Sequence, residues 1–165
     1  MNDMSNGKIA FIGLGLNDET DISLKGLNEI NNCSKVYAEF YTAKLFGTSI
    51  KKLEIQINKK IIILTREKVE QGDKIIEDAK NNHIAFLSCG DSMAATTHLD
   101  LRLRAINEGI QTEIIHGSSI FTAVPGLLGL QNYKFGRTTT LTYTEGDYFP
   151  TSPYDIIKQN HKLGN

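Results

Sequence analysis

The chain has 165 residues, of which 40% are hydrophobic and 22% are charged, and its formal net charge at pH 7 is −1. This composition fits one globular domain, or one domain and the start of another, and the balanced charge excludes an electrostatic footprint for nucleic acid or an anionic membrane. No run approaches the roughly 20 apolar residues of a membrane span, and the polar N-terminus lacks the apolar stretch of a signal peptide. We therefore expect a cytoplasmic protein.

Strand-like apolar runs alternate with helical patterns along the chain. In chain order, we predict a strand at 8–13, a helix at 23–32, strands at 35–40 and 59–64, a helix at 66–79, a strand at 83–88, a helix at 96–108, a strand at 112–116, a helix from 118, a strand at 137–144 and a helix from 154. This alternation predicts an α/β domain with a mostly parallel sheet flanked by helices. Continuously apolar runs such as IIIL and IAFL indicate strands that are covered on both faces.

Two of the predicted helices carry specific expectations. The helix at 66–79 is expected to run through Gly72, which falls on its apolar stripe. In the helix at 96–108, Asp100 is placed to pair with Arg104 at i,i+4. The residues of this helix expected to face inward are Leu99, Leu103 and Ile106.

Towards the C-terminus the pattern changes at EGDYFPTSPY (145–154), where Pro150, Pro153 and Gly146 are typical of a linker. We expect an N-terminal α/β domain at 1–145, a linker at 146–153 and, at 154–165, the first helix of a second domain.

The cysteines and histidines give no sign of a metal or a disulfide. Cys33 and Cys89 lie far apart and outside any CxxC pair, so we predict two free thiols. The histidines lack metal-ligand spacing, and no metal is expected; they are His83, His98, His116 and His161.

Three predicted strands end in stretches of small residues, and ligands of open α/β sheets lie outside such strand ends. In GLGLND (13–18), Gly13 and Gly15 allow either close approach to a ligand or a plain tight turn, and the two readings weigh equally. The dinucleotide motif G-x-G-x-x-G is excluded, because it requires glycine where Asp18 stands.

In CGDSMAATTH (89–98), Asp91 can accept hydrogen bonds from ribose hydroxyls or an amino group, or simply cap the following turn. Thr96 and Thr97 can be helix N-caps, and His98 fits a structural or exposed role better than a catalytic one.

In HGSSI (116–120), Ser118 and Ser119 stand at the start of a predicted helix, where their backbone N–H groups suit binding of a carboxylate. The alternative, that a serine only caps the helix, explains one of the two serines. No nucleophile–base pair stands out along the chain. Such sites suit a transferase whose cofactor carries the reactive group.

Several stretches carry a family resemblance, and they occur in order along nearly the whole chain: FIGLGLNDETDISLKGL, YAEFYT (37–42), REKVE (66–70), GDSMAATTHLDLRLRA, HGSSI with its apolar helix, and YKFGRTTTLTYTEGDYFPTSPYD. The chain resembles the diphthine synthase family, which belongs to the tetrapyrrole-methylase-like S-adenosylmethionine methyltransferases. The glycine-rich start and the GD turn are shared with the wider superfamily. The ATTH, EFYT and YKFG–FPTS segments point to diphthine synthase.

The resemblance implies a two-domain, homodimeric enzyme that methylates the modified histidine of translation elongation factor 2, with S-adenosylmethionine bound between its domains. The cofactor contacts that carry over are Leu16, Asp91, Ala94, Ser119 and Ile120. No catalytic acid or base carries over, because the sulfonium of the cofactor already activates the methyl group.

Two departures from the family pattern leave alternatives open. Ser92 stands where the family usually has proline, which would stiffen the turn. The chain also ends where the second domain of the family begins. A non-catalytic remnant that folds or dimerises is therefore a second reading, and a methyltransferase acting on tetrapyrroles is a third, which the ATTH and YKFG–FPTS segments disfavour.

Overall fold

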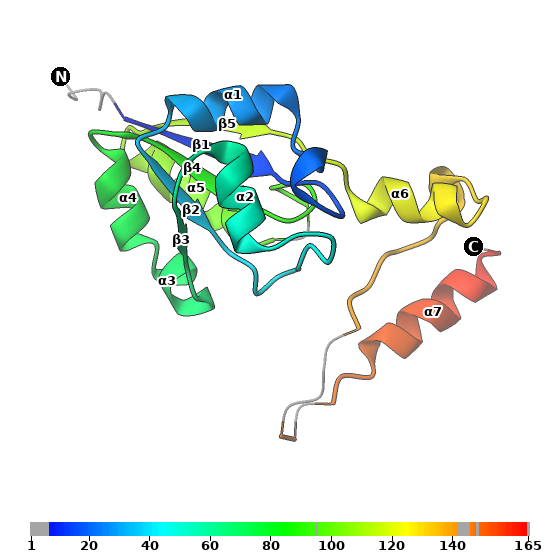
Figure 1. Ribbon diagram of the computed structural model, residues 1–165. Coiled ribbons are helices and arrows are strands. Elements are labelled where there is room, and N and C mark those ends of the chain that lie inside the picture. Colours follow the sequence, from blue (N-terminus) through cyan, green and yellow to red (C-terminus); the bar gives the residue numbers. More distant parts are fainter. Residues whose placement is uncertain (1–6, 95, 142–145, 148, 165) are drawn as a thin grey trace. The chain divides into compact units, whose positions relative to one another are not determined.

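The computed structural model describes residues 7–94, 96–141, 146–147 and 149–164 (Figure 1). In chain order its elements are β1 (Lys8–Gly13), η1 (Glu19–Asp21), α1 (Leu24–Asn32), β2 (Lys35–Ala38), α2 (Ile50–Ile57), β3 (Ile61–Ile63), α3 (Arg66–Gln71), α4 (Asp73–Ala79), β4 (His83–Ser88), α5 (His98–Asn107), β5 (Gln111–Ile115), α6 (Ile120–Leu127), η2 (Asn132–Lys134) and α7 (Ser152–Lys162). Among the described residues, no helix is long and apolar enough to cross a membrane.

The five strands form one sheet in the order β3-β2-β4-β1-β5, and all neighbouring strands run parallel. The predicted α/β class is therefore confirmed. In this sheet β1 lies between β4 and β5, with Gly13 opposite Ser88 and Ile12 opposite Ile115. Because the strands are parallel, the loops that leave β1, β4 and β5 start side by side at one edge of the sheet.

Helices cover both faces of the sheet (Figure 1). Successive strand residues point to opposite faces. Ile9 and Phe11 of β1 pack in one apolar cluster with residues of α3, α4 and α5, whereas Ala10 and Ile12 pack in another with residues of α1 and α2. Residues 9–13 of β1, 36–38 of β2 and 84–88 of β4 are buried on both faces, as the continuously apolar run IAFL predicts. The expectation was wrong for the run IIIL, because β3 is an edge strand in which Ile62 and Ile63 are 40% and 51% exposed.

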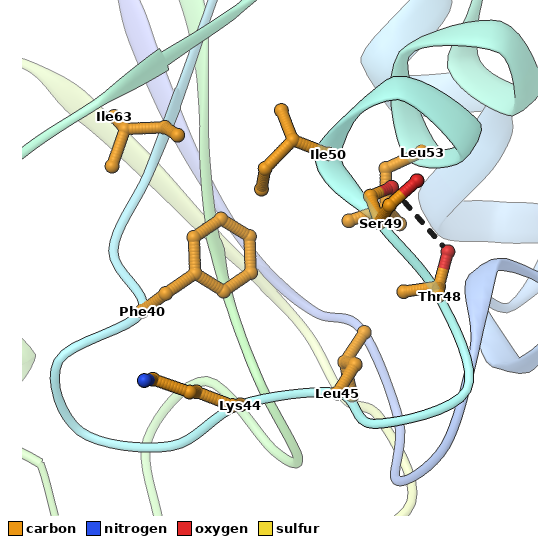
Figure 2. Close-up of a pocket in the computed structure, with 8 residues that line it drawn as sticks. All are labelled: Phe40, Lys44, Leu45, Thr48, Ser49, Ile50, Leu53 and Ile63. Carbon is orange, nitrogen blue, oxygen red and sulfur yellow. Dashed lines mark hydrogen bonds between the residues drawn. The ribbon is translucent and has the colours of Figure 1, made fainter.

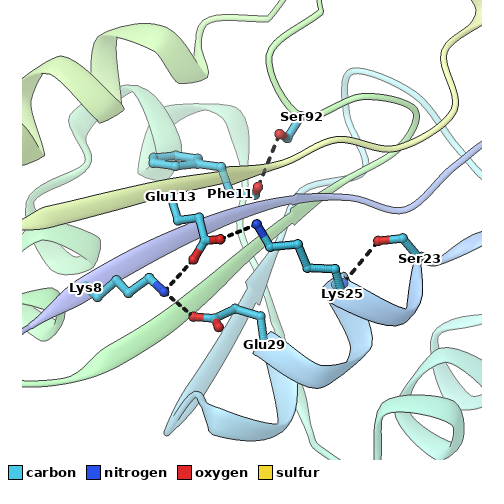
Figure 3. Close-up of polar contacts among 8 residues, drawn as sticks. Lys8, Phe11, Ser23, Lys25, Glu29, Ser92 and Glu113 are labelled. Carbon is cyan, nitrogen blue, oxygen red and sulfur yellow. Dashed lines mark hydrogen bonds and ion pairs between the residues drawn. The ribbon is translucent and has the colours of Figure 1, made fainter.

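Ion pairs tie the start of β1 to its neighbours. The Nζ atom of Lys8 lies 2.7 Å from Glu29 Oε1 of α1 and 2.6 Å from Glu113 Oε2 of β5, and Lys25 Nζ lies 2.6 Å from the other oxygen of Glu113 (Figure 3). Hydrogen bonds from Lys25 and Lys8 hold the pKa of Glu113 below its usual value. These contacts fix α1 over the edge of the sheet opposite the glycine-rich loops.

Helix α5 presents a different face to the core from the one predicted. Leu99, Leu103 and Ile106 are about half exposed, and the buried residues are instead His98, Leu101 and Ala105. Both sets follow helical spacing, so periodicity alone cannot choose between them. The ring of His98 decides the orientation, because it packs edge-on against Phe86 of β4 with the ring centroids 4.8 Å apart.

The predicted helix at 66–79 and its expected neighbour contacts also need correction. Gly72 divides the segment into α3 and α4, because it adopts a left-handed conformation with φ +67°. Its N–H donates a hydrogen bond to Lys68 O, which caps the C-terminal end of α3. Arg104 of α5 lies at this junction. Its guanidinium donates to Glu70 O and Asp73 Oδ1, at 3.1 and 2.9 Å, rather than pairing with Asp100.

The strand predicted at 137–144 is not present in its described part, 137–141, which has no regular secondary structure; residues 142–144 lie outside the described ranges. The backbone of Arg137 exchanges two hydrogen bonds with the side-chain amide of Asn160 in α7, so its polar groups are satisfied without a neighbouring strand. The β-branched content that favours a strand here is thus not sufficient to form one, because β propensity depends on packing and pairing that these exposed residues lack.

The sequence patterns do not predict α2. It is short and rich in isoleucine, which favours strands, and it starts because the Ser49 hydroxyl accepts a hydrogen bond from Lys52 N. Ser23 caps α1 in the same way, as predicted, through Gly26 N.

The chain divides into two compact units, one up to Ile120 and the other from Phe121 to Asn165. The first unit holds the whole sheet and α1 to α5. The second contains η2, α7 and most of α6. The domain limits that the sequence suggests, at 145 and 153, stay a prediction.

Candidate functional site

The loops after β1, β4 and β5 meet through three glycines. A Cβ atom added to Gly13 would lie 2.4 Å from Gly90 O and 2.6 Å from Gly117 N, and one added to Gly117 would lie 2.5 Å from Gly90 O. Real Cβ atoms do not approach so closely. The three backbones are therefore in direct contact, and only glycine fits at Gly13 and Gly117.

Two backbone hydrogen bonds lock the first two loops together. Gly90 N–H donates to Gly15 O at 2.7 Å, and Gly15 N–H donates to Gly90 O at 3.2 Å. Both residues have positive φ, +81° for Gly15 and +69° for Gly90. The face of Gly90 where a side chain would stand is open, with Ser118 O as its nearest neighbour at 3.9 Å. Open space thus lies directly beside the joined backbones.

The loop after β1 turns around Asp21. Its Oδ2 atom accepts hydrogen bonds from the backbone N–H groups of Leu16 and Asn17, at 3.0 and 2.7 Å. Asp18 caps η1 by accepting from Thr20 N, in agreement with the exclusion of a dinucleotide motif at this position. The predicted contact Leu16 is half-buried in this turn, close to Gly15 and Gly90.

Asp91 lies in the turn after β4 and has two partners. Its Oδ1 accepts from Met93 N at 3.1 Å, which is the capping role weighed for it. Its Oδ2 lies 2.7 Å from Nδ1 of His116, which follows β5. The Asp91 side chain is 14% exposed, and that of His116 is 74% exposed. Asp91 thus caps its own turn and also ties it to the loop after β5.

The other predicted contacts lie in the same loops. Ala94 is half-buried, and its N–H donates to Asp91 O at 3.2 Å. Ser119 follows Gly117 in the loop after β5 and is half-buried, and Ile120, which is 61% exposed, is the first residue of α6. The structure therefore brings four of the five predicted residues to three adjoining loops at one edge of the sheet, and the fifth directly follows one of these loops.

Ser92 is fully buried, and hydrogen bonds hold its turn in place of the proline of the family pattern. Its hydroxyl donates to Phe11 O at 3.3 Å (Figure 3), and its carbonyl oxygen accepts from Thr96 Oγ1 at 3.3 Å and from His98 Nδ1 at 3.2 Å. The serine is thus part of the packing between the turn, β1 and the start of α5.

His98 and Glu39 form a buried pair beneath the site. Their side chains are 0% and 1% exposed, and His98 Nε2 lies 3.5 Å from Glu39 Oε1. Since Nδ1 donates to the Ser92 carbonyl, the proton of a neutral ring lies on Nδ1. Burial lowers the pKa of His98, against the opposing effects of the Ser92 carbonyl and the Glu39 charge. His98 is thus structural, one of the two roles expected for it.

Glu39 also shapes the loop 39–49 that follows β2. Its Oε2 accepts hydrogen bonds from the N–H groups of Tyr41 and Thr42, at 3.1 and 3.0 Å. Sequence reasoning assigned no role to Glu39. The sequence feature that could have identified it is a single carboxylate next to a buried strand, because a buried carboxylate needs hydrogen-bond partners inside the fold. His116 was also missed as a partner of Asp91.

Further along, loop 39–49 is attached to the glycine-rich loops. Gly47 N–H donates to Asn17 O at 2.9 Å, and the Cys89 thiol donates to Ala43 O at 3.3 Å. Burial raises the pKa of the Cys89 thiol to about 12, so the thiol keeps its proton at neutral pH. Cys33 and Cys89 are both free, as predicted.

Comparison with known proteins identifies the family of this chain. The family model of the tetrapyrrole (corrin/porphyrin) methylases matches residues 8–160. The chain belongs to the tetrapyrrole methylase family.

Relatives within the family carry a more specific name. A diphthine synthase of Methanosphaera stadtmanae is 53% identical over 154 residues, which cover 93% of this chain and 59% of the relative. One of Methanosarcina barkeri is 51% identical over 161 residues, covering 94% and 60%. A crystal structure of diphthine synthase matches with a TM-score of 0.88 at 41% identity and covers 94% of this chain and 61% of that one. The chain thus spans about three fifths of the length of these relatives.

The burial of His98 predicts how the stability of the fold depends on pH. Because burial lowers the pKa of His98 when folded, the unfolded chain binds a proton there that the folded chain does not. The free energy of unfolding should fall as the pH drops below the unfolded value of about 6.5, by at most about 1.4 kcal/mol per pH unit. We expect His98→Gln to flatten this slope in urea denaturation.

The matched control is His83→Gln, because His83 is an exposed histidine at the start of β4. It should keep the slope of the wild type. A His98→Gln variant with the unchanged slope would contradict the assignment of His98 as a buried neutral base.

Proposed function

We propose that this protein is an S-adenosylmethionine-dependent methyltransferase of the diphthine synthase type, which methylates the amino group of the modified histidine of translation elongation factor 2. The observation that carries the proposal is identity of about 50% to curated diphthine synthases over more than nine tenths of this chain. Because elongation factor 2 acts in translation, the proposal places the protein in the cytoplasm, and it expects a homodimer as in the family.

The three-loop junction supports a site for the cofactor. The backbones of Gly13, Gly90 and Gly117 are packed without side chains, and the open face of Gly90 leaves room for a ligand against the backbone. Leu16, Asp91, Ala94, Ser119 and Ile120 follow these glycines along the chain and are the residues we propose to hold the cofactor. In open α/β sheets, ligands bind at such a crevice outside the strand ends.

Asp91 has the capacity for a further contact. A carboxylate offers about four lone-pair positions, and the bonds from Met93 N and His116 Nδ1 use two of them. The remaining positions can accept hydroxyl groups of a ribose. Since both partners fix the Asp91 carboxylate before a ligand arrives, little entropy is lost when it binds.

The chemistry of the proposal needs positioning above all. S-adenosylmethionine supplies a methyl group that is already activated by its sulfonium. The residues of this chain have to orient the cofactor, exclude water and align the acceptor amine, and such alignment lowers barriers by several kcal/mol. A dedicated general base is unnecessary when the amine arrives unprotonated, and none is proposed.

Substitutions at Asp91 separate its two roles. Asp91→Asn keeps an oxygen that can cap Met93 N but loses the charge, whereas Asp91→Ala loses both. We expect both variants to bind S-adenosylmethionine at least about tenfold more weakly by calorimetry, because Asp91→Asn replaces one charged acceptor oxygen by an amide donor and Asp91→Ala removes both oxygens. Only Asp91→Ala should also lose stability, by about 1 kcal/mol.

If Asp91→Asn bound S-adenosylmethionine as tightly as the wild type, Asp91 would be a cap alone. If Asp91→Ala unfolded while its folded fraction still bound the cofactor, the capping role would also account for the residue without any cofactor contact.

Methyl transfer tests the proposed activity itself. The protein is incubated with S-adenosylmethionine labelled in its methyl group and with elongation factor 2 that carries the modified, unmethylated histidine. We expect label in elongation factor 2, and none when that histidine is replaced. Cofactor binding without transfer would contradict the proposed reaction, and no detectable heat at millimolar cofactor would favour a non-catalytic remnant.

A further inference from the structure

A separate pocket opens at the same edge of the sheet, between loop 39–49, the start of α2 and the end of β3 (Figure 2). Its volume is about 290 Å³, which is ample for one large apolar side chain. Its apolar lining residues are Phe40, Leu45, Ile50, Leu53 and Ile63, and its polar ones are Lys44, Thr48 and Ser49. None of these residues is among the predicted cofactor contacts.

The polar groups of the pocket differ in whether they already have a hydrogen-bond or ion-pair partner. The Thr48 hydroxyl donates to Ser49 O at 3.4 Å (Figure 2), and the Ser49 hydroxyl accepts from Lys52 N as the cap of α2. Lys44 is exposed, and within the described part of the chain its ammonium group has no hydrogen-bond or ion-pair partner. The pocket therefore joins an apolar interior to one uncompensated positive charge at its rim.

Hydrogen bonds attach one wall of the pocket to the loops of the candidate cofactor site. The loop that forms one wall is attached to the β1 loop by Gly47 and Asn17, and to the β4 loop by Ala43 and Cys89. At its base, Glu39 accepts the N–H groups of the loop and faces the buried His98. A ligand that reaches from the cofactor loops along the strand ends would meet this pocket over β2 and β3.

We propose that this pocket binds a segment of the protein substrate, in which an apolar side chain enters the pocket and a neighbouring acidic residue pairs with Lys44. The inference rests on the proposed function, and it adds a recognition site at a distance from the reacting amine. A protein substrate has to be held by more than the modified side chain, and an apolar anchor beside a charge pair is a common way to achieve this. The unpaired charge of Lys44 favours an acidic neighbour on the substrate.

Charge reversal at the rim tests the proposal. Lys44→Glu changes an exposed residue and should leave the fold intact. Methyl transfer is measured at varied elongation factor 2, and cofactor affinity is measured by calorimetry. We expect KM for elongation factor 2 to rise about tenfold, with kcat and S-adenosylmethionine affinity unchanged, because the lost contact lies outside the reacting centre.

The matched control is Lys51→Glu, which makes the same charge change on α2 but away from this pocket, beside Glu54 and Asn58. It should keep the KM of the wild type. A second variant, Ile63→Ser, removes apolar surface from a half-exposed side chain and should also raise KM with kcat unchanged. Added salt should raise KM more for the wild type than for Lys44→Glu.

The outcomes separate the alternatives. An unchanged KM in Lys44→Glu and Ile63→Ser, with an active wild type, would overturn this inference and leave the proposed function standing. Loss of cofactor affinity in these variants would assign the pocket to the cofactor site instead. A changed oligomeric state in sedimentation with an unchanged KM would assign it to contact with a second copy of this chain. A wild type without methyl transfer would overturn the proposed function and this inference with it.

Discussion

Direct contact between three backbones is the constraint on which the candidate site depends. Gly13, Gly90 and Gly117 stand where β1, β4 and β5 end, and no Cβ atom fits at Gly13 or Gly117. The parallel register brings these strand ends to one edge, and the glycines then let the three loops close on one another. Every residue proposed to hold the cofactor follows one of these glycines along the chain. A methyl group at this junction would force apart the loops on which the site is built.

A set of buried polar contacts supports the turn after β4, which forms part of this junction. His98 donates to the Ser92 carbonyl and its ring lies beside the buried carboxylate of Glu39, which in turn holds the N–H groups at the start of loop 39–49. Buried polar groups are costly unless they are paired, so this chain of contacts strongly restricts where the two loops can lie. The same packing that shapes the cofactor loops thus also shapes the wall of the pocket beside them.

Sequence patterns predicted the layers of the fold well, because a strand buried on both faces has to be continuously apolar. They also predicted that the stretches after β1, β4 and β5 adjoin, since the carboxyl ends of parallel strands share an edge, whereas the five candidate contacts within these stretches came from the family resemblance. They were wrong where two solutions satisfy the same periodicity: α5 turns its other stripe inward because His98 packs on Phe86. They were wrong at Gly72, where a left-handed turn interrupts a helical pattern, and they gave no role to Glu39 or His116 because those contacts join residues far apart in sequence.

The central claim is that the three loops at the ends of β1, β4 and β5 bind the cofactor. Hydrogen exchange of the backbone amides, measured with and without S-adenosylhomocysteine, tests it most directly. The account predicts slower exchange on binding at residues 14–17, 90–94 and 117–120, which adjoin the glycine junction. Unchanged exchange in these loops, with protection confined to another part of the chain such as 40–50, would contradict it.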